Sequence, residues 1–375
     1  MTSATEHLAH LIRIPSPSAV CNRPVVEYAA EVLHAAGWTT RGLPYRDLAN
    51  IEKINLIAAP PGQSLSDHDV DLVLMCHTDT VPYAADWADA LNPIVRDHHL
   101  HGCGACDVKG FLACVLSAAT QTSAAQCAPG LRIVLTTDEE IGCIGASHLV
   151  ADHALHPRRM VIGEPTMLRP ARAGKGYCLS EVTITGKEAH SAHPTQGVSA
   201  IYHAARLIAA IEDFAAQWSQ QTNSFFDPPA TTVNIGTIRG GTAKNIVPGQ
   251  CTFELEWRPI PDQDPAAVLA SVTAIVTNLS VAHPGVHAEV RPLRQQPGFE
   301  TPAGAALVRK VEALSGRPAV SIPFGSEASI FAPLAQEIIV FGPGDMRTAH
   351  SSRECVPLAE LEAATAILAT LMQSA

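Results

Sequence analysis

The pattern of hydrophobic and polar positions divides the chain into two kinds of region. In residues 1–173 and 291–375, short apolar runs alternate with stretches whose apolar residues recur at helical spacing. Short apolar runs are typical of buried parallel strands, and their alternation with helices predicts an α/β fold with a mostly parallel sheet covered on both faces. The apolar runs are 71–75, 131–135, 160–162 and 338–341, and the helical stretches are 25–38, 110–119 and 358–372.

The middle of the chain has a different pattern. Residues 252–258 alternate strictly, with Phe253, Leu255 and Trp257 on one side and charged residues on the other. This alternation is typical of an antiparallel strand with one buried face. Together with further strand-like and helical segments, it predicts a small α+β sandwich. The other strand-like segments are 177–186 and 231–238, and the helical ones are 198–218 and 265–279.

The length of the chain supports this division into two domains. A chain of 375 residues exceeds what one ordinary core covers, and 47% of the residues are hydrophobic, which is enough for sizeable cores. The charged fraction of 16% argues against a disordered protein. We therefore expect residues 174–290 to form an α+β domain inserted into a larger α/β domain of residues 1–173 and 291–375.

Charge and composition exclude some classes of partner. The formal net charge is -11 and no Lys/Arg cluster occurs, so we expect no nucleic-acid partner. The first 20 residues do not have the pattern of a secretory signal, and residues 267–282 are apolar but interrupted by Ser, Thr and Asn, so no membrane span is expected. The ten cysteines are scattered, which argues against a disulfide framework. A cytoplasmic protein is the expectation.

Polar clusters follow each of four predicted strands. Because ligands collect beyond the carboxyl ends of parallel strands, we expect these side chains to meet in one crevice. A further carboxylate, in a glycine-rich segment between the first two clusters, would join them. The clusters are His77 with Asp79, Asp138 with Glu139 and Glu140, Glu164, and His350, and the additional carboxylate is Asp107.

Two histidines with several carboxylates favour a catalytic zinc pair over a Cys-rich structural zinc. Such a site needs one bridging carboxylate and one acid or base that touches neither ion, and the adjacent Glu139 and Glu140 can divide the roles of base and ligand. Asp79, two residues after His77, could hydrogen-bond the imidazole opposite the metal. Taken singly, each residue has an ordinary explanation: a structural histidine, an acidic helix start, or Asp107 as a helix cap.

The ordered motifs resemble the family of aminoacylase, acetylornithine deacetylase, succinyl-diaminopimelate desuccinylase and glutamate carboxypeptidase. The resemblance extends over almost the whole chain. It rests on Leu74–Pro82, Gly102–Gly110, Thr137–Gly142, Gly163–Thr166 and Ala349–Glu354. Within the family, Gly186–Pro194, Gly240–Pro248 and Cys143 are similar to the acetylornithine deacetylase branch.

The resemblance implies a di-zinc exopeptidase-like α/β catalytic domain, with Co²⁺ as an alternative metal. One ion would be held by His77, Asp107 and Glu164, and the other by Asp107, Glu140 and His350. Asp107 would then bridge the two ions, and the peptide bond after it would be cis. Asp79 would orient His77, and Glu139 would act as general base and then as proton donor to the leaving amine.

The resemblance also implies the reaction, which is hydrolysis of the N-acyl amide of an amino acid. The leading substrate is N2-acetyl-L-ornithine, an intermediate of arginine biosynthesis. Residues 174–290 would close over the site and form a homodimer, and His190 would stabilise the oxyanion within one copy or across the dimer.

Arg258, beside Asn245, could clamp the substrate carboxylate or could pair with Glu254 or Glu256. Ser326 would meet the substrate carboxylate and Glu327 a cationic side chain, or both could belong to a polar turn.

The chain departs from the family at Cys103, where Arg is usual, and at Cys76, where Gly is common. Cys103 and Cys106 have CxxC spacing, but with no partner pair this is weak evidence for metal or redox chemistry, and packing is favoured. A dipeptidase, a carboxypeptidase, a deacylase for another N-acyl amino acid and a non-catalytic binding protein on the same fold are the rival functions. The last should lack Glu139 or a ligand, and all of them are present.

Overall fold

The computed structural model describes residues 2–65 and 70–374, which divide into two compact units. The first unit comprises Met1–Arg172, Glu300–Val320 and Ser326–Ala375, and the second comprises Ala173–Phe299 and Ser321–Gly325. The second unit is longer than the expected inserted domain. Residue 290, its expected end, lies within strand β14 (His287–Gln296), which pairs with its neighbour along its length, so the unit continues to Phe299.

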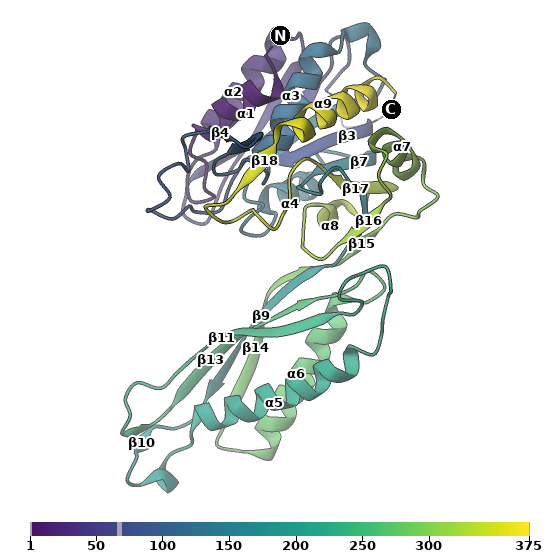
Figure 1. Cartoon of the computed structure of the whole chain (residues 1–375). Coiled ribbons are helices and arrows are strands. Elements are labelled where there is room, and N and C mark those ends of the chain that lie inside the picture. The colour runs from purple at the N-terminus through teal and green to yellow at the C-terminus, as the bar shows by residue number, and fades with distance from the viewer. Residues whose placement is uncertain (1, 66–69, 375) are drawn as a thin grey trace. The chain divides into compact units, whose positions relative to one another are not determined.

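A nine-stranded mixed sheet forms the centre of the first unit (Figure 1). Its four central strands, in the order β6-β3-β7-β17, are parallel, and each coincides with one of the expected apolar runs. Antiparallel strands flank them on both sides. The nine are β1 (Thr39–Arg46), β2 (Glu52–Ala59), β3 (Val70–His77), β6 (Leu131–Thr136), β7 (Pro157–Gly163), β8 (Ala171–Gly174), β15 (Phe299–Glu300), β16 (Val320–Ile322) and β17 (Glu337–Phe341).

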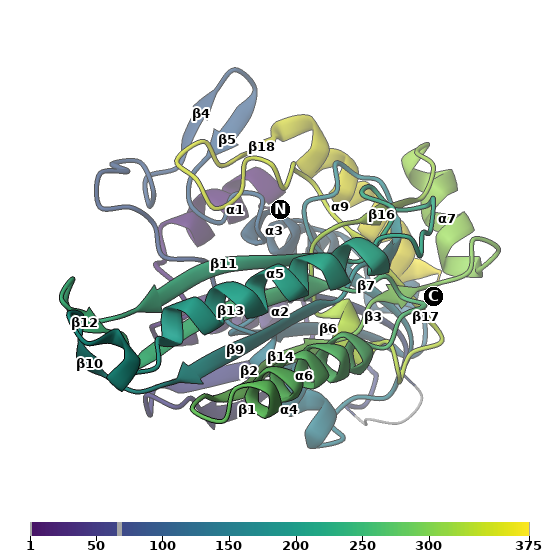
Figure 2. The ribbon, with the colours of Figure 1, turned by 90° about the horizontal axis from the view of Figure 1, so that it is seen from below.

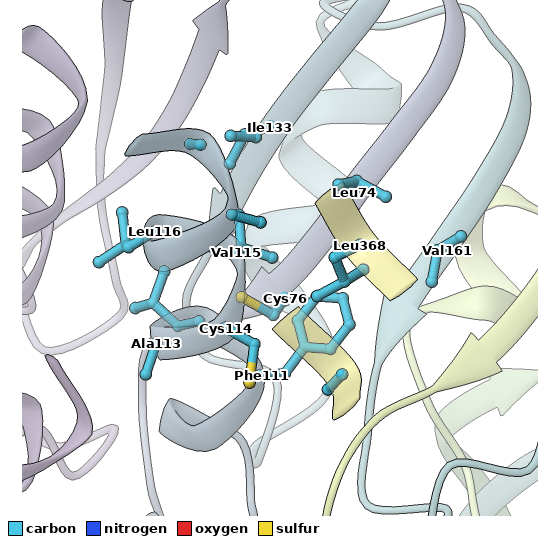
Figure 3. Packing of buried hydrophobic residues seen from close by; sticks show 14 of the residues in the cluster. Leu74, Cys76, Phe111, Ala113, Cys114, Val115, Leu116, Ile133, Val161 and Leu368 are labelled. Atoms are coloured by element: carbon cyan, nitrogen blue, oxygen red, sulfur yellow. The ribbon is translucent and has the colours of Figure 1, made fainter. Parts of the chain in front are cut away.

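Helices cover both faces of this sheet, as parallel strands require (Figure 1). Helices α1, α2, α3 and α9 lie on one face, and α4 and α8 lie on the other. In the core of the first face, Phe111 and Val115 of α3 pack against Leu74 of β3, Ile133 of β6 and Leu368 of α9 (Figure 3). The helices are α1 (Ala4–Ile12), α2 (Arg23–Ala35), α3 (Lys109–Gln121), α4 (Ile144–Ala151), α7 (Ala306–Ser315), α8 (Ala328–Phe331) and α9 (Leu358–Gln373), with a short 3-10 turn at Ala124–Gln126.

A smaller three-stranded sheet lies next to the glycine-rich segment 102–107 in the chain. Strand β5 (His99–His101) pairs with β4 (Ile94–Arg96) and with β18 (Cys355–Pro357). The pairing of β18 with β5 joins a segment near the end of the chain to the residues that precede Asp107.

The second unit is an antiparallel four-stranded sheet with two helices on one face (Figure 2). In β13, Phe253, Leu255 and Trp257 are buried and the residues between them are half-exposed, so the expected alternation is confirmed. The sheet has the order β11 (Thr232–Gly240), β13 (Gln250–Arg258), β9 (Tyr177–Thr185) and β14, and the helices are α5 (Ala200–Trp218) and α6 (Pro265–Ala282). A two-stranded ribbon of β10 (Ala189–His190) and β12 (Ile246–Val247) and a 3-10 turn at Pro194–Gln196 complete it.

Helix α6 is the one helix among the described residues that is long and apolar enough to cross a membrane, with a mean hydropathy of 1.7. Val268, Val272 and Val276 on one side of it are buried in the core of the second unit. Length and composition alone are weak evidence for a span, because helices of soluble proteins meet the same criterion. The expectation that this segment does not span a membrane stays a prediction.

Candidate metal centre

The expected ligands converge at the carboxyl ends of the four central parallel strands. His77 is the last residue of β3, and Glu164 directly follows β7. Glu140 follows β6, and His350 lies in the segment after β17. Asp107 lies just before α3, which packs on the same sheet. Because β6, β3, β7 and β17 are neighbours, residues far apart in the sequence meet at one edge of the sheet.

Asp107 contacts a histidine with each of its carboxylate oxygens. Its Oδ1 is 3.2 Å from Nε2 of His77, and its Oδ2 is 3.0 Å from Nε2 of His350. Glu164 Oε1 is 4.0 Å from Nε2 of His77, and Glu140 Oε2 is 3.2 Å from Nε2 of His350. Two groups of potential ligands therefore share Asp107: one with His77 and Glu164, and one with Glu140 and His350.

The donor set fits a pair of zinc ions. Within each group the ligand atoms lie within 4.8 Å of one another, and they are imidazole nitrogens and carboxylate oxygens, which zinc accepts in catalytic sites. Oε1 of Glu140 is buried and has no hydrogen-bond partner among the described residues, as expected of an oxygen that faces an ion. The peptide bond between Asp107 and Val108 is cis, as the resemblance implies.

Asp79 links the first histidine to the turn that carries the glutamates. Nδ1 of His77 is 3.0 Å from the main-chain oxygen of Asp79 and 3.5 Å from its carboxylate, so the main chain is the closer partner. The carboxylate accepts hydrogen bonds from Ser18 Oγ and from the backbone N–H groups of Glu139 and Glu140, at 2.7, 3.2 and 3.3 Å. Asp79 thus positions both His77 and the Glu139–Glu140 turn.

Glu139 is placed beside the ligands but belongs to neither group. Burial raises the pKa of its carboxyl to about 8, with the nearby Glu140 adding to the effect and His77 opposing it. The thiol of Cys143 donates to Oε1 of Glu139 at 3.4 Å. A carboxyl group whose pKa lies near neutrality can accept a proton and return it during one reaction cycle.

A buried ion pair between Lys53 and Asp138, which the sequence did not predict, positions the Glu139–Glu140 turn. Asp138 has a positive φ of 60° and precedes the two glutamates. Its carboxylate accepts from Lys53 Nζ and from the Tyr45 hydroxyl, both at 2.8 Å. Lys53 is fully buried and also donates to two main-chain oxygens, those of Ser18 and Val20. No sequence signal distinguishes this lysine, because its role depends on a fold contact 85 residues away.

Glu354 is a second functional candidate that sequence reasoning left without a role. It lies in the motif after His350 and is 2% exposed. Its Oε2 accepts from the backbone N–H of Gly104 at 3.0 Å, and its Oε1 accepts from those of Cys106 and Asp107, both at 3.1 Å. Burial raises the pKa of the Glu354 carboxyl to about 7, and these hydrogen bonds oppose that rise.

The cysteines near the site are buried thiols. Cys103 and Cys106 are 1% and 0% exposed, and all ten cysteines are free. The Cys106 thiol lies 3.6 Å from Glu354 Oε1 and 3.7 Å from the Thr348 hydroxyl. Burial raises the pKa of Cys103 to about 11, which disfavours the reactive thiolate. These features agree with the packing role expected from the sequence.

The expected substrate-contacting residues of the second unit do not lie together. His190 in β10 is exposed and pairs with Ile246, the residue after Asn245. Arg258 is the last residue of β13, whereas Gly240, in the glycine pair before Asn245, is opposite Cys251 near the start of β13. Seven residues of extended strand span roughly 23 Å at about 3.3 Å each. The expectation that Arg258 lies beside Asn245 and Gly240 is therefore wrong.

Arg258 makes the ion pair that the sequence left as an alternative. Its Nε donates to Oε1 of Glu256 at 2.8 Å, and its guanidinium lies 4.6 Å from the ring centroid of Tyr177. Arg294 lies at the same distance from that ring. The contact with Glu256 uses Nε, and the contact with Tyr177 uses the face of the guanidinium, so two contacts hold this group in place.

Ser326 and Glu327 are both buried in the first unit. Ser326 is 1% exposed, and its hydroxyl accepts from the backbone N–H of Ala328 at 3.4 Å. Glu327 is 0% exposed, and burial raises its pKa to about 7, while the nearby His77 opposes the rise. Both residues are therefore buried rather than on an open loop, and Glu327 lies close enough to His77 to interact with it electrostatically.

Comparison with known sequences identifies the family. Residues 73–374 match the model of Peptidase family M20/M25/M40. The chain is 42% identical to an acetylornithine deacetylase of Myxococcus xanthus over 363 residues, covering 96% of this chain and 94% of that protein. It is 30% identical to an acetylornithine deacetylase of Proteus mirabilis over 378 residues, covering 97% of this chain and 94% of that protein.

Solved structures show the same fold. A tripeptidase from Staphylococcus aureus is 24% identical with a TM-score of 0.76, covering 99% of this chain and 97% of that one. A dinuclear metal-binding peptidase from Bacillus subtilis is 15% identical with a TM-score of 0.69, covering 99% and 97%. The expected α/β fold with a second α+β unit is confirmed. The chain therefore belongs to Peptidase family M20/M25/M40, as a metallohydrolase similar to the acetylornithine deacetylases.

Proposed function

We propose that this protein hydrolyses the N-acyl amide of an amino acid, with N2-acetyl-L-ornithine as the substrate and L-ornithine and acetate as the products. The observation that carries the proposal is the 42% identity to an acetylornithine deacetylase over 96% of the chain. The cluster around Asp107 supports it, because amide hydrolysis needs an activated water beside a carboxyl group that can move a proton. We propose the cytoplasm as the site of this reaction.

Two zinc ions are the proposed cofactors. His77, Asp107 and Glu164 would hold one, and Asp107, Glu140 and His350 would hold the other. Co²⁺ is the proposed substitute, because it accepts the same nitrogen and oxygen ligands. When bound, the ions polarise the acyl oxygen and lower the pKa of the attacking water.

The proton movements are assigned to Glu139. Its carboxylate takes the proton from the attacking water and gives it to the leaving nitrogen, so the C–N bond breaks as the amine forms. Asp79 keeps the Glu139–Glu140 turn in place through two backbone N–H groups. The Cys143 thiol donates to Oε1 of Glu139, and we assign the transferred proton to the other oxygen.

The second unit is proposed to act as a lid and as the interface of a homodimer. Within one copy, a substrate of small-molecule size cannot contact both His190 and Arg258, because β13 separates the two ends of the sheet by roughly 23 Å. We therefore assign His190, with the neighbouring Asn245, to the active site of the partner copy. There the imidazole would stabilise the oxyanion that forms at the acyl carbon.

Arg258 is the proposed partner of the substrate carboxylate. Its guanidinium is already fixed by Glu256 and Tyr177, so little side-chain freedom is lost when a carboxylate binds its Nη atoms. Ser326 remains a proposed contact of the same carboxylate. Glu327 is the proposed partner of the side-chain ammonium of ornithine, because a buried carboxylate is stabilised by a cation.

A substrate panel tests the proposed reaction. The purified zinc-loaded protein is offered N2-acetyl-L-ornithine, other N-acetyl amino acids, N-succinyl-diaminopimelate and dipeptides, and the released amine is measured. The proposal requires the highest kcat/KM for N2-acetyl-L-ornithine. Turnover of dipeptides alone would assign the protein to the peptidases instead.

Mixing two inactive variants tests the dimer. His190→Ala lacks the oxyanion donor and Glu139→Gln lacks the base, so each alone should be inactive. When the two are unfolded and refolded together, a mixed dimer has one site that takes His190 from one copy and Glu139 from the other. Restored activity in the mixture supports the assignment across copies, and no restoration despite mixed-dimer formation contradicts it.

A further inference from the structure

Glu354 contacts the loop of Asp107, the residue that both ligand groups share. The residue is 247 positions away from Asp107 in sequence, yet its carboxylate accepts three backbone N–H groups of the loop that carries Asp107. One of these is the N–H of Asp107 itself. Charge-assisted hydrogen bonds of this kind are stronger than neutral ones and fix both the position and the direction of the donor.

The segment around Glu354 is itself anchored. Its main-chain oxygen accepts from the N–H of Gly102 at 3.3 Å, and its own N–H donates to Ser351. Cys355, the next residue, pairs with His101 in the small sheet. The Asp107 loop is therefore held by backbone contacts at its start and by the Glu354 carboxylate at its end.

The same segment carries His350, four residues before Glu354. His350 and Asp107 belong to the same ligand group, and they are 3.0 Å apart. The segment from His350 to Glu354 thus supplies one ligand of this group, His350, and also holds the loop that carries another, Asp107. A displacement of the loop would move Asp107 relative to both histidines at once.

We propose that Glu354 is a positioning residue that holds the bridging Asp107 in register with His350 and so sets the affinity of the metal pair. This inference rests on the two-metal centre of the proposed function. Glu354 belongs to neither ligand group and acts only through the Asp107 loop. Removing such an outer partner commonly weakens metal binding by about 10- to 100-fold.

The test compares Glu354→Gln with wild type and with Glu337→Gln. Gln has the same size, but its NH₂ group cannot accept a hydrogen bond. At least one of the three backbone N–H groups would therefore lose its acceptor. Glu337 is the matched control, because its carboxylate accepts the backbone N–H groups of Ala306 and Leu307 at 3.2 and 2.7 Å, at the amino end of β17 and away from the ligands.

Each protein is stripped of metal and titrated with Co²⁺ while its visible absorption is followed, and bound zinc is counted after equilibrium dialysis. Glu354→Gln should bind the metal pair about 10- to 100-fold more weakly, and excess metal should restore its kcat. Glu337→Gln should titrate like wild type. A Glu354→Gln titration that matches wild type overturns the proposal, as does weaker binding in both variants.

Glu354→Asp keeps the test usable if the Gln variant does not fold. Its carboxylate is one methylene shorter and cannot reach all three N–H groups at once, so an intermediate loss of affinity is expected, and wild-type affinity would contradict the proposal. The wild-type titration distinguishes the two failures. If wild type binds fewer than two ions, the proposed function fails, whereas two ions with an unaffected Glu354→Gln variant overturn only the role of Glu354.

Discussion

The largest sheets of the two units organise their polar residues in opposite ways. In the first unit, four neighbouring parallel strands end at one edge, and residues from 77 to 350 meet there around Asp107. In the second unit the strands are antiparallel, and His190 and Arg258 lie near opposite ends of the sheet. A parallel sheet thus gathers distant residues into one site, whereas an antiparallel sheet distributes them between two ends. Substitutions in each unit test this contrast.

The largest effect is expected for Glu139→Gln in the first unit. The amide cannot accept a proton from water, so kcat should fall by about 10²- to 10⁴-fold. Both metal ions should be retained, because Glu139 belongs to neither ligand group. Steady-state kinetics and metal analysis check this, and a variant with near wild-type kcat would remove Glu139 from its role.

His190→Ala, at the tip of the second unit, should have the next largest effect. Loss of one oxyanion donor typically lowers kcat by about 10²- to 10³-fold, with little change in KM. His193→Ala is the control, because His193 is a second exposed histidine on the same loop, with its ring 6.4 Å from that of His190. A change in KM alone, or equal losses in both variants, would argue against the oxyanion role.

Arg258→Gln should act on binding rather than on turnover. A hydrogen bond to a charged group contributes about 1.5–3 kcal/mol, so KM should rise by roughly 10- to 100-fold. The loss should be smaller for a substrate whose α-carboxylate is replaced by a carboxamide. Arg291→Gln, which removes an exposed partner of Glu181, is the control. An equal loss with both substrates would show that Arg258 does not read the carboxylate.

The smallest effect on turnover is expected for Ser18→Ala. This change removes the hydroxyl that donates to the buried Asp79, and the free energy of unfolding should fall by about 1.5–3 kcal/mol. Ser16→Ala is the control, since the buried Ser16 hydroxyl has no hydrogen-bond partner among the described residues. Denaturant unfolding measures both variants, and equal stabilities would show that Ser18 does not support Asp79.

The metal centre was predictable because its residues follow strands that have a clear sequence pattern. Apolar runs identified β3, β6, β7 and β17, and the polar residues after them are the ones that converge. The bridging role of Asp107 needed the family motif, because this residue precedes a helix rather than following a strand. Strands with a regular apolar pattern, and the polar residues at their ends, were therefore predictable from the sequence.

The supporting residues were not predictable in this way. Lys53 contacts main-chain oxygens and the carboxylate of Asp138, and Glu354 contacts main-chain N–H groups far away in sequence. The sequence around a single lysine or glutamate does not indicate that its side chain is buried. The misplaced Arg258 has another cause. Its position along β13 was known, but its neighbours depend on strand register, and a shift of two residues keeps the same side chains buried, so alternation alone does not exclude such a shift.

The sharing of Asp107 has a consequence for how metals load. Since one carboxylate belongs to both ligand groups, occupancy of one group fixes an oxygen-bearing side chain that the other group also needs. Binding at the two positions is then thermodynamically linked, and each ion must change the dissociation constant of the other by the same factor. Isotherms for this protein should therefore be fitted with an interaction parameter rather than as two independent sites.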